Sequence, residues 1–480
     1  VSVMDGHRVD VIDLNAIRKE PIKIEPKEFD KWVENETTNF LHKSNPDVLC
    51  IGGIITQYKR IKQITTLCNK LLPNVPIILG GGIASCMPEF MIRRLPINIA
   101  VQEEGEVTFS EVLTRLEKGI SLKGCKGIAY KNQISKSEFD VQNNGLRTSV
   151  ISGYKQGLNQ DGASLNSLPW PLRSKYPIDE IYKRNPVGHL NWESKWNKGA
   201  PTDNTPYSVS LLASRGCPYA VSACDYCYAK YLGATYRLRS PKDVVDEMYY
   251  LKTRYDVKYV HFLDDLMMTD HRWAIKFFDE INRRRIRNGF EIEFGCTART
   301  NIIANDIIRA KKEGRKNILE YGYEVGWRQA GYGIESASPT ILKNIDKSGQ
   351  TLEKMELALT ETQRVLGYAD CSFMIAAPGE TAVTVRETVD FCKKVGLAPE
   401  VFFFTTAYPA TPFWDLAMKK GLIGKAVTGE KCDADEDIIE QYFIKLGEQG
   451  DEVRTNFSDL SDEEIIDLSW WAINELGAQN

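Results

Sequence analysis

The sequence predicts an α/β protein with an N-terminal Rossmann-like domain, a partial (β/α)6 barrel of the TIM type and a small helical C-terminal region. Three observations support this prediction. The 480 residues are too many for one ordinary core, apolar runs alternate with helical patterns along most of the chain, and the end of the chain reads as acidic helices. We divide the chain into a first domain (1–130), a connector (131–205), the barrel (206–424) and the helical region (425–480).

The first domain is predicted from nearly continuous apolar runs, which are typical of parallel strands buried on both faces. Strands and helices are expected in alternation, with strands over 8–14, 47–54, 75–82 and 97–101 and helices over 58–72 and 106–117. Ligands of such sheets bind at the carboxyl ends of the strands, where glycines cluster. Because Val1 is not an initiator methionine and a strand follows it at once, we expect a further strand and helix upstream of the printed chain.

The barrel is predicted from six strand–helix units. Strands are expected over 207–213, 259–263, 292–296, 330–334, 371–375 and 401–408, and helices over 241–254, 271–287, 304–313, 351–366 and 381–395. The working face of such a barrel is formed by the carboxyl ends of its strands. The connector lacks this periodicity and is rich in turn-forming residues.

The composition excludes several classes of protein. Lysine plus arginine is 61 against 65 acidic residues, a net charge of −4, which lacks the basic footprint of a nucleic-acid binder. No apolar run reaches the roughly 18 residues that a membrane span requires. Eleven cysteines in 480 residues are too sparse for a disulfide scaffold, so we expect a reducing compartment, the cytoplasm. The expected partner is a small-molecule or biosynthetic-intermediate substrate.

The strongest chemical signal is a group of three cysteines, Cys217, Cys224 and Cys227, directly after a predicted strand. Three thiolates from one loop can ligate three irons of a 4Fe-4S cluster and leave the fourth iron open. A structural zinc loop is the first alternative, but zinc requires a fourth ligand and no further Cys or His lies between residues 190 and 260. Three unrelated core cysteines are the second alternative.

The segments around these cysteines resemble the radical S-adenosylmethionine (SAM) enzymes. Residues 214–219 and 224–227 resemble the cluster loop of that family, and the later landmarks are residues 236–247, 261–265, 331–336, 373–381 and 408–412. Residues 79–85 and 101–106 resemble the cobalamin-binding domain of one large branch. The chain is thereby identified as a member of the cobalamin-binding-domain radical SAM family, similar to its class B methylases, over about residues 7–425.

Two features depart from the family pattern. The family spaces its cysteines C-x3-C-x2-C, whereas six residues separate Cys217 from Cys224, so residues 220–222 resemble an insertion. A loop absorbs such added length at little entropic cost. The first domain also lacks the Asp-x-His-x-x-Gly motif that supplies a ligand to cobalt.

The resemblance implies that Cys217, Cys224 and Cys227 hold the cluster and that SAM binds beside it. Tyr226 is a candidate contact of the adenine, and the turn at Gly379 would let the backbone approach that ring, as glycine permits.

Polar residues at predicted strand ends are the remaining candidates for SAM. Asp264 and Asp265 could bind its amino group or ribose, or could instead cap the following helix. Arg299 could pair with its carboxylate or form a structural salt bridge. Glu335 and Ser336 could hold its methionine moiety.

The resemblance also implies a cobalamin site in the first domain. Gly81, Gly82 and Gly105 would let the corrin and its nucleotide tail lie against the backbone, and Thr56 could donate a hydrogen bond to the tail. The alternative is a Rossmann-like domain with ordinary glycine turns and no cofactor.

The function that the resemblance implies is cleavage of SAM to a 5′-deoxyadenosyl radical, followed by cobalamin-dependent methyl transfer to an unactivated carbon. An electron donor such as flavodoxin or ferredoxin would reduce the cluster. A radical oxidative cyclase or rearrangement enzyme with the same cofactors is one alternative, and a non-catalytic cobalamin and iron–sulfur sensor is another.

Overall fold

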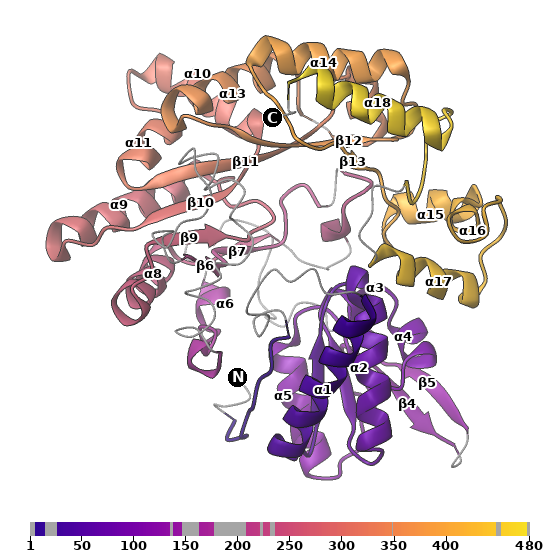
Figure 1. The fold of residues 1–480 in the computed structure, drawn as a ribbon. Helices are drawn as coiled ribbons and strands as arrows, with labels where there is room; N and C mark the ends of the chain where they lie inside the picture. The colour runs from indigo at the N-terminus through magenta and orange to yellow at the C-terminus, as the bar shows by residue number, and fades with distance from the viewer. Residues whose placement is uncertain are drawn as a thin grey trace.

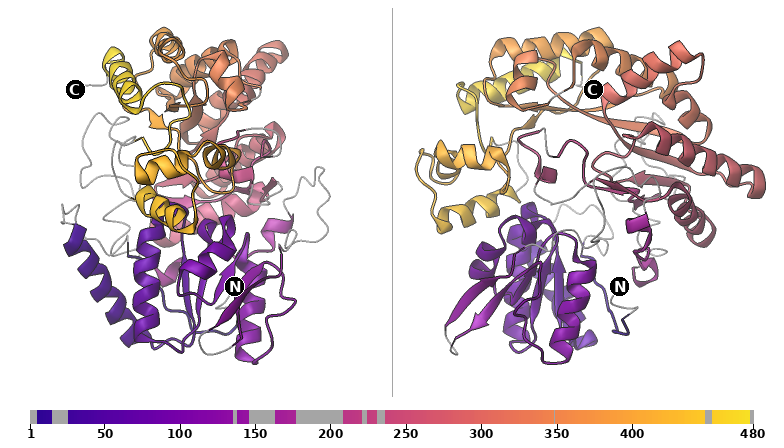
Figure 2. Two further views of the ribbon diagram at one scale, coloured as in Figure 1. Left: turned by 90° about the vertical axis from the view of Figure 1, so that its right-hand side faces the viewer. Right: turned by 180° about the vertical axis from the view of Figure 1, so that it is seen from behind.

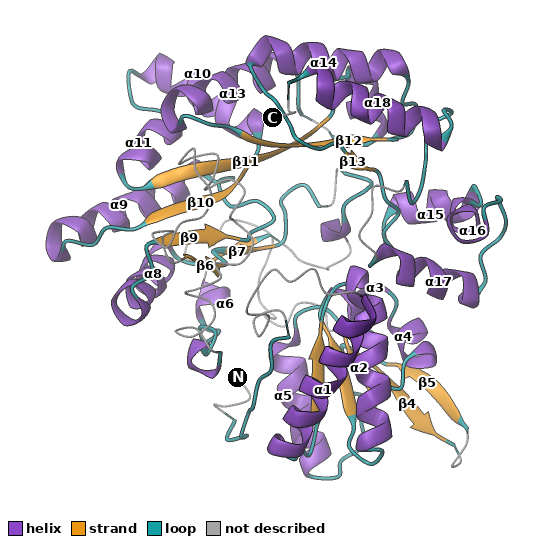
Figure 3. Cartoon of the chain, in the orientation of Figure 1, coloured by secondary structure: helices purple, strands orange, loops and turns teal. Residues whose placement is uncertain are grey.

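The computed structural model describes residues 5–14, 26–134, 138–145, 163–176, 208–220, 224–230, 236–347, 349–447 and 453–477. Most of the predicted connector lies outside these residues, as do Val221 and Ser222 of the predicted insertion. The described parts form an N-terminal domain, a curled parallel sheet with helices on its outer side, and a helical C-terminal region (Figures 1 and 3). The predicted fold class is confirmed.

The N-terminal domain contains a five-stranded sheet in the order β1-β2-β3-β4-β5. The first three strands are parallel and the last two are antiparallel: β1 (Leu49–Gly52), β2 (Ile77–Gly80), β3 (Ile99–Val101), β4 (Ile128–Gln133) and β5 (Phe139–Asn143). The helical elements are α1 (Pro26–Ser44), η1 (Ile55–Gln57), α2 (Tyr58–Leu71), α3 (Gly82–Cys86), α4 (Pro88–Arg94) and α5 (Gly105–Glu117). The sheet therefore continues past residue 130.

The strand expected over residues 8–14 is absent, so that prediction is wrong. These residues form no ladder with the sheet. Their apolar side chains do not pack in a sheet; instead, Val9 and Val11 line a cavity together with Trp170 and Leu172. An alternation of apolar and polar residues in a loop that packs on one side gives the same pattern as a half-buried strand.

The second sheet has six parallel strands in the order β6-β9-β10-β11-β12-β13. Its strands lie at the predicted places: β6 (Ser208–Leu211), β9 (Tyr259–Phe262), β10 (Glu293–Ala298), β11 (Trp327–Glu335), β12 (Asp370–Ile375) and β13 (Phe403–Phe404). Its helices are α8 (Pro241–Tyr255), α9 (His271–Asn288), α10 (Thr300–Glu313), α11 (Ile318–Glu324), α12 (Pro339–Asn344), α13 (Leu352–Leu366) and α14 (Ala382–Val395). A short antiparallel pair, β7 (Ser214–Arg215) and β8 (Arg237–Leu238), flanks the cysteine segment.

The barrel helices begin and end at residues with a local physical reason. The side chain of Asp270 accepts hydrogen bonds from the first amides of α9 at 2.8 and 3.1 Å, as a helix N-cap does. Gly289, Gly314 and Gly367 end α9, α10 and α13 with positive φ, which glycine adopts without steric cost. These signals explain why the helices were predictable from the sequence.

The C-terminal region joins the two sheets. It consists of α15 (Pro412–Lys419), α16 (Leu422–Thr428), α17 (Glu436–Leu446) and α18 (Asp462–Glu475). Helix α18 packs against α14 of the barrel, whereas α17 packs against α2 and η1 of the N-terminal domain (Figure 1). Among the described residues, none of the helices is long and apolar enough to cross a membrane.

A buried carboxylate anchors α17 to the N-terminal domain. Glu440 accepts hydrogen bonds from the Tyr58 hydroxyl and the Lys62 ammonium, both at 2.6 Å, and from Arg94 Nε at 3.0 Å. Beside it, the rings of Tyr58 and Phe443 lie 5.6 Å apart in a shared apolar core. These contacts attach α17 to the N-terminal domain, which lies on the concave side of the curled sheet (Figure 2).

Candidate active site

The cysteine loop follows β7 and is fixed by backbone hydrogen bonds. The amide of Cys224 donates to Asp346 O at 2.8 Å, and the amide of Asp225 donates to Ile345 O at 3.2 Å. The amide of Cys227 then donates to Cys224 O at 2.9 Å. The second half of the loop is therefore attached to the segment that follows α12, beyond the carboxyl end of β11.

The three predicted ligands are half-buried thiols that share one electrostatic environment. The pKa of Cys227 is raised to about 11, mainly by burial, with the neighbouring Cys224, Asp265 and Cys217 contributing in the same direction. Burial also raises the pKa of Cys217, again with Cys224 and Asp265 contributing. Thiols that perturb one another in this way gain from a cation among them, because metal binding favours the thiolate form.

The arrangement of these thiols separates the iron–sulfur and zinc alternatives. Within the described part of the chain, no three His, Cys, Asp or Glu side chains converge on the position of a single metal ion. A structural zinc site requires such convergence, whereas a 4Fe-4S cluster spreads its thiolates over separate iron atoms. Three thiolates from one loop fit a 4Fe-4S cluster, which takes three protein ligands and leaves its fourth iron open.

Arg299 packs on the cysteine loop. Its guanidinium carbon lies 3.8 Å from the centre of the Tyr219 ring, a cation–π contact. Asn301 Nδ2 also donates to the Tyr219 hydroxyl at 3.2 Å. The predicted role of Arg299 toward SAM stays a prediction, and the structure adds that this residue positions the loop through Tyr219, which the sequence analysis missed.

The two adjacent carboxylates predicted to bind SAM occupy different environments. Asp264 is buried, and its oxygens accept hydrogen bonds from the Ala213 amide at 3.1 Å and from the Ser214 hydroxyl. Burial raises the pKa of Asp264 to about 6, although these hydrogen bonds act to lower it. Asp265 is exposed and perturbs Cys217 electrostatically. Asp265 thus remains available to a ligand, whereas the carboxylate of Asp264 anchors the start of the cysteine loop, and neither caps α9.

Glu335 belongs to a buried network at the carboxyl end of β11. Its Oε1 accepts hydrogen bonds from the Tyr226 hydroxyl at 3.0 Å and from Lys347 Nζ at 2.9 Å. Lys347 Nζ also donates to the Tyr226 hydroxyl at 2.8 Å. Burial, followed by the charges of Glu335 and Cys224, raises the pKa of Tyr226. The structure therefore brings the predicted residues Tyr226 and Glu335 together and adds Lys347.

Several residues at the strand ends have strained backbones. Cys224, Glu335 and Ala376 have φ values of 64°, 66° and 69°, and Glu103 beyond β3 has a φ of 57°. Residues other than glycine adopt this left-handed region uncommonly, and such residues cluster at functional sites. Glu335 and Ala376 lie at the carboxyl ends of β11 and β12, and Cys224 is one of the predicted ligands.

The segment after β12 carries Gly379 and a buried carboxyl group. Gly379 has a φ of +79°, and a Cβ there would lie 2.5 Å from Asn344 Nδ2, so the close approach requires glycine. Ser336 turns toward α14, with its Oγ 3.2 Å from Thr388 Oγ1. Glu380 Oε1 accepts a hydrogen bond from Thr384 Oγ1 at 2.7 Å, and its Oε2 has no hydrogen-bond partner among the described residues.

Glu380 makes the stability of the protein depend on pH. Burial raises its pKa from 4.5 to about 7, so stability is lost as the pH rises through this interval. Glu380→Gln removes the titration, and the variant is expected to exceed the wild type by up to about 3 kcal/mol above pH 7. Urea unfolding at pH 5 and pH 8 checks this prediction. An equal gain at both pH values, or the same gain in the exposed control Glu430→Gln, would contradict it.

Several glycines gather at the strand ends of the N-terminal domain and form what we call the glycine surface. Gly52 and Gly80 pair in register, and neither has an atom within 4 Å of the position that a Cβ would take. Gly81 has a φ of +83°, and a Cβ there would lie 2.6 Å from Gly53 O. Gly105 begins α5 with only one ordinary contact at its Cβ position. This surface fits a large flat ligand such as a corrin.

The predicted residue Thr56 lies in η1, beside the end of α17. A Cβ on Gly447 would come within 2.4 Å of Thr56 O, so the helical region closes on this turn. The cysteine loop reaches the same domain, because the Tyr228 hydroxyl donates to Gly82 O at 2.9 Å. The glycine surface and the cysteine loop are thus direct neighbours.

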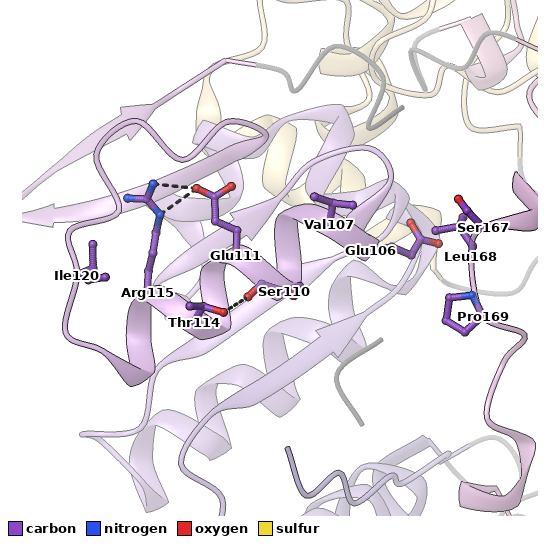
Figure 4. Close-up of a pocket in the computed structure, with 10 residues that line it drawn as sticks. All are labelled: Glu106, Val107, Ser110, Glu111, Thr114, Arg115, Ile120, Ser167, Leu168 and Pro169. Atoms are coloured by element: carbon purple, nitrogen blue, oxygen red, sulfur yellow. Dashed lines mark hydrogen bonds and ion pairs between the residues drawn. The ribbon is translucent and has the colours of Figure 1, made fainter. Parts of the chain in front are cut away.

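Two grooves flank this site without including a cysteine. One, of about 580 Å³, runs along α5 and is closed by Ser167, Leu168 and Pro169; Figure 4 shows Arg115 pairing with Glu111 along it. A larger cavity of about 730 Å³ lies between residues 165–176 and the edge strand β6.

Comparisons with known proteins agree with this geometry. Residues 211–392 match the family model of the radical SAM superfamily, and residues 2–113 match that of the B12 binding domain. The chain therefore carries a radical SAM domain and a B12 binding domain. The two matched regions correspond to the curled sheet with its cysteine loop and to the domain with the glycine surface.

Several proteins resemble this radical SAM protein over most of their length. An uncharacterized methyltransferase of Pyrococcus horikoshii is 27% identical over 391 residues, 81% of this chain and 73% of the relative. Cytidylyl-2-hydroxyethylphosphonate methyltransferase of Streptomyces wedmorensis is 20% identical, covering 88% and 76%. Anaerobic magnesium-protoporphyrin IX monomethyl ester cyclase of Rubrivivax gelatinosus is 22% identical, covering 88% and 67%.

Solved structures share the fold of this radical SAM protein. The methyltransferase TsrM of Kitasatospora setae, solved with cobalamin and a 4Fe-4S cluster, superimposes with a TM-score of 0.60 at 18% identity, covering 84% of this chain and 71% of that protein. The cobalamin-dependent radical enzyme OxsB gives a TM-score of 0.52 at 21% identity, covering 79% and 48%. At these identities the likeness concerns the fold.

Proposed function

We propose that this protein is a cobalamin-dependent radical SAM methyltransferase that transfers a methyl group to an unactivated carbon of a small molecule. The observation that carries the proposal is the contact between its two halves. Tyr228, which directly follows Cys227, donates its hydroxyl to the carbonyl of Gly82 at 2.9 Å. The cysteine loop of the radical SAM domain therefore lies against the glycine surface of the B12 binding domain.

The residues of the site divide the work. When bound, SAM on the reduced 4Fe-4S cluster supplies an adenosyl radical, and cobalamin supplies the methyl group. Cys217, Cys224 and Cys227 would hold the cluster. Asp265 and the Glu335–Lys347 pair offer both signs of charge at the strand ends, as the zwitterionic methionine part of SAM requires.

The proposal extends to the cellular setting. All eleven cysteines are free of disulfides, which supports a reducing compartment, and we place the protein in the cytoplasm. A small electron carrier such as flavodoxin or ferredoxin would reduce the cluster. A radical oxidative cyclase is the second candidate, because magnesium-protoporphyrin IX monomethyl ester cyclases are among the relatives.

The test requires no knowledge of the substrate. The protein is reconstituted anaerobically with iron, sulfide and hydroxocobalamin, reduced, and incubated with SAM that carries a deuterated methyl group. A methyltransferase is expected to transfer the label to the bound cobalamin and to release 5′-deoxyadenosine. A cyclase would release 5′-deoxyadenosine without labelling cobalamin. If neither labelled cobalamin nor 5′-deoxyadenosine is formed, the protein is a non-catalytic sensor and the proposal is overturned.

A further inference from the structure

We propose that Tyr228 is a positioning residue that couples the cysteine loop to the cobalamin-side glycine turn, so that a ligand bound at one site changes the affinity of the other. The inference rests on the proposed function, which places SAM and its cluster at the cysteine loop and cobalamin at the glycine surface. It adds an energetic connection between the two sites and assigns that connection to one side chain.

The contacts of Tyr228 reach from one domain into the other. Its hydroxyl donates to Gly82 O at 2.9 Å, and its ring edge lies 3.6 Å from the position of a Cβ on Gly82. Cys86 and Glu103, two further residues of the B12 binding domain, act electrostatically on the phenol. Because Cys227 precedes Tyr228 directly, a displacement of the glycine turn acts on a ligating cysteine through a single residue.

The opposite flank of the cysteine loop is held by the same domain. Arg215 Nη1 lies 3.1 Å from Glu104 Oε2, and Arg215 also pairs with Glu106. Arg237, the residue paired with Arg215 in the β7–β8 ladder, forms an ion pair with Glu104. Burial acts first to raise the pKa of Glu106, but the Arg215 guanidinium lowers it overall, so this carboxylate stays charged at neutral pH.

The two loops that hold the flanks are joined to each other. Ser85 Oγ accepts a hydrogen bond from the Glu103 amide at 2.8 Å and donates to Gly81 O at 3.2 Å. The side chain of Ser85 therefore links the turn after β2, which Tyr228 touches, to the turn after β3, which the arginines touch. A ligand that shifts this unit shifts both ends of the cysteine loop.

Coupling between two binding sites is reciprocal. If SAM changes the affinity for cobalamin by some factor, cobalamin changes the affinity for SAM by the same factor. One neutral hydrogen bond between the sites can support a factor of about two to ten. Tyr228→Phe removes the hydroxyl and keeps the ring, so it should bring this factor close to one without disturbing packing.

The experiment measures the dissociation constant of hydroxocobalamin for the cluster-loaded protein with and without saturating SAM, by absorbance titration, together with the reverse titration. The wild type is expected to show equal factors of about two to ten in both directions. Tyr228→Phe is expected to lose the factor while keeping its iron content. Tyr321→Phe, whose hydroxyl contacts Asp279 on the barrel exterior, is the matched control and should keep it.

Two outcomes would overturn the inference: a wild-type factor of one, or a factor retained in Tyr228→Phe. If Tyr228→Phe loses iron, Glu104→Gln takes its place, because it weakens both arginine contacts that fix the other flank of the loop. Without that fixed flank the Tyr228 contact no longer transmits the shift, so the factor should also fall. A wild-type protein that binds no cobalamin at all would contradict the proposed function itself, which distinguishes that failure from a failure of the coupling.

Discussion

Iron content is expected to fall from about four atoms per chain to near none, and SAM cleavage to stop, when any one of Cys217, Cys224 and Cys227 is replaced by alanine. The three thiols come from one loop, so loss of one leaves two ligands for a cluster that needs three from the protein. Iron quantification, the visible absorbance of the cluster and release of 5′-deoxyadenosine are the measurements. Cys432→Ser is the control, because it removes a thiol that packs against Gly424 of α16 and lies outside the cysteine loop.

The three variants also test the longer spacing in the loop. If Cys217→Ala keeps the cluster while the other two variants lose it, the extra residues have displaced Cys217 and another ligand completes the site. If all three retain iron and activity, the cluster is held elsewhere and the site has been placed wrongly.

A second large effect is expected from the buried Glu335–Lys347 pair. Glu335→Gln and Lys347→Met should each weaken SAM binding by about 10- to 100-fold, the range for a lost hydrogen bond to a charged group, while iron content stays unchanged. Asp265→Asn should act in the same direction, because its carboxylate is exposed beside the thiols. Equilibrium dialysis with labelled SAM gives the dissociation constants.

A double variant separates binding from folding. Removing one member of a buried ion pair leaves the other uncompensated and costs about 3–5 kcal/mol of stability, whereas removing both is close to neutral. Glu335→Gln combined with Lys347→Met should therefore recover the stability of the wild type and still bind SAM poorly. Recovery of SAM binding in the double variant would show that the pair supports the fold alone.

The barrel could be predicted from the sequence because its signals are local. Buried parallel strands are continuous apolar runs, and their helices start at capping residues such as Asp270 and end at glycines such as Gly289. Helix α1 was missed because most of its residues are polar or charged. Strands β4 and β5 were missed because their antiparallel pairing leaves them partly exposed.

The site was predictable only where its residues carry a motif. Motifs led to the prediction of the cysteines, Tyr226 and Glu335 as site residues, and the structure brings Tyr226 and Glu335 into contact. Lys347 has no local signal, because its partner Tyr226 lies 121 residues away in the sequence. Asp264 and Asp265 are neighbours with the same chemistry, and only the three-dimensional structure separates the one that anchors the loop from the one that faces solvent.

The Glu440 anchor has a consequence for how this protein can be taken apart or recombined. The carboxylate is supplied by the C-terminal region, yet its three donors, Tyr58, Lys62 and Arg94, all belong to the B12 binding domain. A fragment that ends after β5 would leave these groups and the surface beneath Phe443 open to water. In a chimera between relatives, α17 and the N-terminal domain must therefore come from the same parent protein, although the whole barrel separates them in the sequence.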